Sequence, residues 1–288
     1  MRPKNLKTKI FLDSGDPLET KKIIKALGFL DGQTTNPTLI AKNPKIVERI
    51  KKGNKFTEQE IYNSYRQIIQ AISKLIPNGS VSIEAYADFK TTSSQMAAQA
   101  REMNSWIPNA HIKLPIIKEG LAAANRIVQE GIKVNMTLCF TQEQAAAVFL
   151  ATKGVRKGDV FISPFVGRLD DIGQDGISLI SNILKNYRRE KFNHVEVLSA
   201  SVRTMPHFLA SLSLECDIIT APLKILLEWA EKGCPVPDKS YVYESGFKTI
   251  PFTDSLVLAK DWKKLNIENK LTRKGIEKFC ADWGMLLA

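Results

Sequence analysis

Short β-branched segments and amphipathic segments alternate eight times along this chain, and this alternation restricts its fold more than any other feature. The predicted strands are Lys9–Asp13, Phe29–Thr35, Val81–Tyr86, His111–Leu114, Lys133–Leu138, Asp159–Ser163, His194–Leu198 and Asp217–Thr220. The predicted helices are Pro17–Leu27, Thr57–Leu75, Thr91–Ser105, Ile117–Gln129, Gln142–Thr152, Gly176–Tyr187, Met205–Ser213 and Pro222–Glu231. Such alternation is typical of a parallel sheet with right-handed crossovers.

Two parallel-sheet folds fit this pattern, and the first loop favours one of them. A doubly wound sheet that binds a dinucleotide would carry G-x-G-x-x-G after the first strand, but the chain reads DSGDP at 13–17. Eight units match a closed barrel, so we predict an α/β fold of the (β/α)8 TIM-barrel class. We expect one domain over residues 1–288, with the barrel at about 8–235. The C-terminal extension, about 236–288, ends in a predicted helix at Arg273–Leu287 and packs on the barrel.

Composition excludes several classes of protein. The 288 residues are 44% hydrophobic, which excludes disorder, and no apolar run approaches the ~18 residues of a membrane span. The N-terminus has no signal-peptide core, and the four cysteines show no C-x-x-C pairing. We therefore expect a cytoplasmic protein with reduced thiols and no membrane partner. The net charge of +11 admits a nucleic-acid-binding alternative, but no helix-turn-helix or zinc module accompanies it, and a solvated basic surface is the simpler interpretation.

Polar side chains occur where the predicted strands end, which is where TIM barrels place their functional groups. In chain order these residues are Asp13, Asn36, Glu84, Lys113, Asn135, Thr137 and Ser163. Lys113 lies between Ile112 and Leu114, so its side chain points into the barrel if theirs face the helices. A desolvated lysine amine can attack carbonyls and form a Schiff base. The alternative is that Lys113 closes a strand and reaches solvent.

The neighbouring polar residues complete an assembly that an aldolase needs. Asp13 and Glu84 are expected to face the same cavity, and Asn135 and Thr137 share one strand face. Carboxyl groups there can move protons during carbon–carbon cleavage. Each residue also has a structural interpretation: Asp13 could cap the following helix, and Asn36 could hold the turn before a proline.

Two loops suggest an anionic ligand. Arg168 follows the sixth predicted strand, and Ser201 and Arg203 follow the seventh. Two arginines and a serine on adjacent loops can bind a phosphate through charge-assisted hydrogen bonds. Alternatively, Arg168 pairs with Asp170 or Asp171.

Together these segments resemble the transaldolases. The matching segments are FLDSGDP (11–17), TTNPTLI (34–40), SIEA (82–85), IKLP (112–115), VNMTLCFT (134–141), ISPFVGRLDD (162–171) and SASVR (199–203). They occur in the family's order and extend from about residue 9 to residue 222.

The resemblance implies a Schiff-base aldolase mechanism without metal or organic cofactor, and sugar phosphates as substrates. Lys113 would form the imine, Asp13 would take the proton of the C4 hydroxyl, and Glu84 and Thr137 would hold a water. Asn36, Asn135 and Ser163 would position the dihydroxyacetone unit, and Arg168, Ser201 and Arg203 would hold the phosphate. The resemblance implies a place in the pentose phosphate pathway and leaves a homo-oligomer open.

A branch of this group, the fructose-6-phosphate aldolases, releases dihydroxyacetone instead of transferring it. Those proteins carry Gln in place of Glu84 and Tyr in place of Phe165, so this chain resembles the transferring branch. The aldolase remains the alternative function. The region Lys239–Asn269 has no counterpart that we can place in the family.

Overall fold

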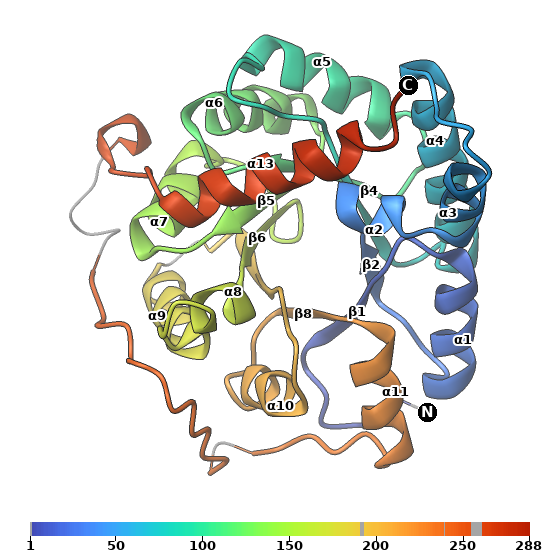
Figure 1. Ribbon diagram of the computed structural model, residues 1–288. Coiled ribbons are helices and arrows are strands. Elements are labelled where there is room, and N and C mark those ends of the chain that lie inside the picture. The colour runs from blue at the N-terminus through green and yellow to red at the C-terminus, as the bar shows by residue number, and fades with distance from the viewer. Residues whose placement is uncertain (1, 191–192, 239, 255–260) are drawn as a thin grey trace.

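Eight parallel strands close into a barrel in the computed structural model, which describes residues 2–190, 193–238, 240–254 and 261–288 (Figure 1). The strands are β1 Lys9–Asp13, β2 Gly32–Thr34, β3 Ser80–Glu84, β4 Ala110–Pro115, β5 Val134–Cys139, β6 Val160–Pro164, β7 Val195–Ser199 and β8 Ile218–Ala221. Each strand pairs with the next, and β1 pairs with β8. The predicted (β/α)8 barrel is confirmed.

Helices surround the strands and bury their apolar faces against them (Figure 1). They are α1 Pro17–Leu27, α2 Pro37–Ala41, α3 Pro44–Lys51, α4 Glu58–Leu75, α5 Ser93–Asn104, α6 Lys118–Ile127, η1 Val128–Glu130, α7 Gln142–Ala151, α8 Val166–Asp170, α9 Gly176–Arg189, α10 Met205–Ser213, α11 Leu223–Glu231, η2 Trp262–Lys264 and α13 Lys270–Gly284. No helix within the described ranges has the length and apolar character required to cross a bilayer.

Three short helices, α2, α3 and α8, were absent from the sequence prediction. Each has only five to eight residues, too few to show an apolar repeat. Capping chemistry starts two of them: Asn36 caps α2, Asn43 caps α3, and a proline follows each cap.

The second strand is shorter than the predicted Phe29–Thr35. Gly32 begins it because a Cβ there would lie 2.5 Å from the ring of Phe11, so only glycine fits. Before it, the Asp31 carboxylate accepts a hydrogen bond from the backbone N–H of Ile10 at 2.8 Å, while the Asp31 backbone bonds Ile10 and Ser80, each at 3.0 Å.

The C-terminal extension packs on the barrel, as predicted. Its first part runs outside α9 and α7 (Figure 1), where the amides of Asn182 and Gln142 donate to the carbonyls of Ile250 and Pro251, each at 2.8 Å. This is how the structure places most of the region without a family counterpart; residues 239 and 255–260 lie outside the described ranges.

The last helix, α13, lies across the barrel beside α2 (Figure 1). The predicted bounds Arg273–Leu287 are displaced by three residues. The reason is Asn269, whose Oδ1 accepts the backbone N–H of Leu271 and starts the helix earlier. Thr272 then donates from Oγ1 to the Leu138 carbonyl at the end of β5, at 2.9 Å, which anchors α13 over the carboxyl ends of the strands.

Candidate active site

A cavity of about 340 Å³ opens at the carboxyl ends of the strands. It is lined by most of the residues that the sequence singles out: Asp13, Asn36, Lys113, Thr137, Ser163, Phe165, Arg168, Ser201 and Arg203. The other two, Glu84 and Asn135, lie directly behind this wall, where they contact Lys113 and Ser163. The structure therefore brings all eleven side chains into one region.

Lys113 is buried at the centre of this region, with a side chain only 4% exposed. Its β4 position is in register with Glu84 on β3, so the two side chains face each other across neighbouring strands. Lys113 Nζ lies 2.8 Å from Glu84 Oε2 and donates a hydrogen bond to the Thr35 carbonyl at 2.9 Å. The alternative that Lys113 reaches solvent is wrong.

Tyr65 anchors the backbone at Glu84. The Glu84 backbone N–H donates to Tyr65 Oη at 2.8 Å, and Tyr65 in turn lies 3.0 Å from Thr35 Oγ1. Burial raises the pKa of Glu84, and the charge of Lys113 opposes that rise. The result is a carboxylate that is more basic than usual beside an ammonium group.

Asp13 lies at the end of β1 and does not cap the next helix, because Asp16 is the N-cap of α1. Thr34 Oγ1 donates to Asp13 Oδ1 at 2.7 Å and lies 2.6 Å from Thr220 Oγ1. Since Thr34 has one hydroxyl proton and gives it to Asp13, Thr220 must donate to Thr34. Burial raises the pKa of Asp13, while the Thr34 hydrogen bond and Lys113 lower it.

A second polar row comes from β5 and β6. Ser163 Oγ donates to Asn135 Oδ1 at 2.7 Å, and Asn135 Nδ2 donates to Ser82 Oγ at 3.1 Å, so Asn135 is fixed in one orientation. Thr137 is also fully buried, and its Oγ1 has no hydrogen-bond partner among the described residues. A buried hydroxyl of this kind is suited to hold a water or a substrate oxygen.

Asn36 combines a structural contact with a place in the cavity wall. Its Oδ1 accepts a hydrogen bond in the first turn of α2, as the structural alternative predicted, while the residue still lines the cavity.

The two arginines lie on the same side of the cavity in different environments. Arg203 forms a two-pronged ion pair with Asp171, at 2.6 and 2.9 Å. Arg168 is half-buried, and burial together with Arg203 lowers its pKa. Asp170 pairs with His207 instead, so neither predicted carboxylate forms an ion pair with Arg168. Ser201 has a φ of 56°, which holds this loop in a conformation unusual for serine.

Several residues in the cavity wall were missed from the sequence. Thr34, the last residue of β2, belongs to the TTNPTLI segment but was not singled out. Thr220 is an internal residue of β8, and α13 contributes Lys278 and Phe279. The rule that barrel sites form at strand ends cannot identify residues on a helix that returns from the C-terminus.

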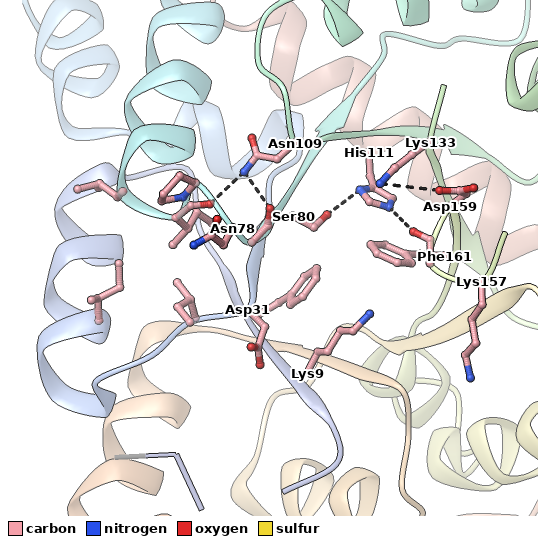
Figure 2. Close-up of a pocket in the computed structure, with 18 residues that line it drawn as sticks. Lys9, Asp31, Asn78, Ser80, Asn109, His111, Lys133, Lys157, Asp159 and Phe161 are labelled. Atoms are coloured by element: carbon pink, nitrogen blue, oxygen red, sulfur yellow. Dashed lines mark hydrogen bonds and ion pairs between the residues drawn. The ribbon is translucent and has the colours of Figure 1, made fainter. Parts of the chain in front are cut away.

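A second cavity, of about 580 Å³, lies at the opposite, amino end of the barrel (Figure 2). Its lysines face acidic partners: Lys9 lies 2.8 Å from Glu196, and Lys133 lies 3.8 Å from Asp159. His111 stacks on Phe161 with ring centroids 4.0 Å apart. Ion pairs and the stacked rings therefore line this cavity, whereas the candidate catalytic residues lie at the other end of the barrel.

Comparison with known proteins identifies the family to which the chain belongs. The family model described as "Transaldolase/Fructose-6-phosphate aldolase" matches residues 10–288. A probable transaldolase of Dehalococcoides mccartyi is 38% identical over 220 residues, which cover 76% of this chain and 89% of that protein. A probable transaldolase of Myxococcus xanthus is 32% identical over 275 residues, 96% of this chain and 94% of its own length. One from Leptospira biflexa is 37% identical over 259 residues, 89% of this chain and 99% of its own. The chain is thus an aldolase-type enzyme that belongs to the transaldolase/fructose-6-phosphate aldolase family.

Proposed function

We propose that this enzyme is a transaldolase, which transfers a dihydroxyacetone unit from a ketose phosphate to an aldose phosphate through a Schiff base on Lys113. The observation that carries the proposal is the buried Lys113–Glu84 pair, 2.8 Å apart, in a cavity that also contains Asp13 and two arginines. Sedoheptulose 7-phosphate or fructose 6-phosphate would be the donor.

Imine formation needs a neutral amine and a route for protons. Glu84 is placed to take a proton from Lys113, and its raised pKa makes it a better base for this step. The amine then attacks the C2 carbonyl, and the carbinolamine loses its oxygen as water. Thr137, with its unpartnered buried hydroxyl, can hold that water with Glu84.

Cleavage then follows from the position of Asp13. Its carboxylate takes the proton of the C4 hydroxyl, the C3–C4 bond breaks, and the bonding electrons move to the imine to give an enamine. The aldose phosphate leaves, and another aldehyde accepts the enamine carbon in the reverse steps. Asn36, Asn135 and Ser163 would hold the three-carbon unit, while Arg168, Ser201 and Arg203 would hold the phosphate.

Phe165 favours transfer over release. It lines the cavity and packs edge-on against Phe140, with centroids 5.8 Å apart. A phenyl ring offers no donor to organise a water that would hydrolyse the enamine-derived imine, so the bound unit would survive until an acceptor arrives. The fructose-6-phosphate aldolase activity is the second candidate, because the family contains both activities.

Borohydride trapping tests the Schiff base. Wild-type protein incubated with fructose 6-phosphate and reduced should gain a three-carbon adduct on Lys113, located by peptide mass spectrometry. Lys113→Ala should gain none, whereas Lys157→Ala, which changes an exposed lysine at the amino end, should be labelled normally. An adduct that persists in Lys113→Ala, or its absence from wild type, contradicts the mechanism.

A coupled assay separates the two candidate functions. Glyceraldehyde 3-phosphate release from fructose 6-phosphate should be fast only when erythrose 4-phosphate is present. Free dihydroxyacetone accumulating equally fast without an acceptor would identify an aldolase instead.

Four further expectations from the sequence concern the setting of the reaction and the protein as a whole. A place in the pentose phosphate pathway, a cytoplasmic location, a single domain and a homo-oligomer stay predictions.

A further inference from the structure

A buried histidine lies beside the proposed phosphate loop and has no part in the mechanism above. His207, in the first turn of α10, places Nε2 2.7 Å from Asp170 Oδ2 at the end of α8. The two side chains are only 7% and 11% exposed. Together they connect α8, which carries Arg168, to the start of α10, which follows Arg203.

The hydrogen bonds of the ring assign its tautomer. Nε2 must carry a proton to bond the Asp170 carboxylate, which leaves Nδ1 as an acceptor in the neutral ring. The backbone N–H of Arg203 donates to this Nδ1 in a long hydrogen bond of 3.4 Å. Burial lowers the pKa of His207, with Arg203 acting in the same sense and Asp170 and Asp175 opposing it. The neutral form satisfies both neighbours at once.

The loop that carries Arg203 needs such support. Ser201 holds a left-handed φ of 56°, a conformation that persists only when its surroundings enforce it. The Gly167 N–H donates to the Ser201 carbonyl at 3.1 Å. The Arg203 side chain lies so close over Gly167 that a Cβ there would be 2.6 Å from Arg203 Nε. Asp171 orients the guanidinium, while the His207 ring contacts the backbone from which it extends.

We propose that His207, held by Asp170, is a positioning residue that fixes the Arg203 backbone and thereby sets the preference for phosphorylated over unphosphorylated sugars. This inference rests on the proposed function, because it assigns the phosphate to Arg203. It predicts that disturbing His207 weakens binding of the phosphate end of a substrate and leaves chemistry at Lys113 intact. The reason is that the His207 ring bonds Asp170 and Arg203, whereas Lys113 pairs with Glu84.

Three substitutions test the two hydrogen bonds of the His207 ring, one to Asp170 and one from the Arg203 backbone. His207→Phe keeps a ring and loses both bonds. His207→Asn keeps an acceptor near the position of Nδ1, and Asp170→Asn keeps the shape of the partner but removes its charge. Ser213→Ala, at the far end of the same helix, is the matched control.

Two readouts distinguish positioning from general damage. The first is KM for fructose 6-phosphate with competitive inhibition by inorganic phosphate, and the second is the rate at which borohydride traps dihydroxyacetone on Lys113. His207→Phe should raise KM for fructose 6-phosphate and the inhibition constant of inorganic phosphate about tenfold. That is the size of the effect expected when a misplaced Arg203 loses one charge-assisted hydrogen bond to the phosphate. The trapping rate with dihydroxyacetone should stay within about twofold, and His207→Asn should recover part of the loss.

The outcomes are separable. Equal losses with phosphorylated and unphosphorylated probes would show a merely structural role and overturn the proposal, as would unchanged KM and inhibition constants in His207→Phe. If that variant does not fold, Asp170→Asn gives the same comparison. A wild-type enzyme that traps no dihydroxyacetone contradicts the proposed function itself, which is a different result.

Discussion

In the proposed mechanism Glu84 is the base for Lys113, whose Nζ lies 2.8 Å from Glu84 Oε2. Glu84→Gln removes both the counter-ion and the base, so adduct formation with fructose 6-phosphate should slow by about 10²-fold or more. Samples of the reaction quenched with borohydride at a series of times measure the rate of adduct formation. Glu196→Gln is a matched control, because it breaks a Lys–Glu pair of the same 2.8 Å length at the amino end. A similar loss of rate in both variants would show that the effect is on the fold.

Burial raises the pKa of Asp13, and the hydrogen bond from Thr34 opposes that rise. Asp13 accepts a proton only when ionised, so kcat/KM should fall as the pH is lowered through its raised pKa. The Thr34 hydrogen bond lowers that pKa, and Thr34→Val should therefore raise it and move the acid limb of the profile to higher pH. Thr34→Ser keeps the donor and should leave the limb in place. A limb that does not move in Thr34→Val would contradict the assignment of this limb to Asp13.

Helix α6 packs closely against the end of β4, the strand that carries Lys113. A Cβ added at Gly120 would lie 2.0 Å from the Pro115 carbonyl oxygen, a backbone atom two residues beyond the lysine. Gly120→Ala should lower the free energy of unfolding by about 1–3 kcal/mol through overpacking, measured by urea denaturation. Gly284→Ala, at the exposed end of α13, meets nothing within 4 Å and should be neutral or gain up to about 1 kcal/mol. A neutral Gly120→Ala would mean that α6 can move away from the strand.

Helix length decided which helices could be predicted from the apolar repeat in the sequence. Helix α1 was predicted to the residue, because an apolar repeat and a proline mark it, whereas the longer α4 begins one residue after its predicted start. Short α8 escaped, although it carries Arg168, because five residues cannot show a period of 3.6. Most residues of the proposed site could be located because functional groups of a TIM barrel lie at the carboxyl ends of its strands, and the sequence predicts where each strand ends.

The whole molecule should lose stability in acid because of His111, a buried histidine at the amino end of the barrel. His111 is buried between Ser80 Oγ and the Gly158 carbonyl, at 2.7 and 2.9 Å (Figure 2), and burial lowers its pKa to about 3. The folded ring stays neutral while the unfolded ring takes up a proton below its ordinary pKa of about 6.5. The unfolding free energy should therefore fall as the pH drops from about 6.5 towards about 3, with a slope from this group of up to about 1.4 kcal/mol per pH unit.

Urea denaturation at pH 7 and pH 5 tests this dependence. His111→Gln should be less stable than wild type at pH 7 but should lose less stability on going to pH 5. An equal loss in both proteins would place the acid sensitivity elsewhere.

The barrel, the order of its strands and the polar side chains at their ends could all be predicted from the sequence. These follow from local periodicity, and the closure of eight parallel strands brings their carboxyl ends together. The side-chain pairs Lys113–Glu84 and Asp170–His207 became visible in the folded molecule and not before. The same is true of the position of α13 across the mouth of the barrel. The physical reason is that pairing depends on strand register and on how distant segments pack, and neither is contained in the spacing of residues along one stretch of chain.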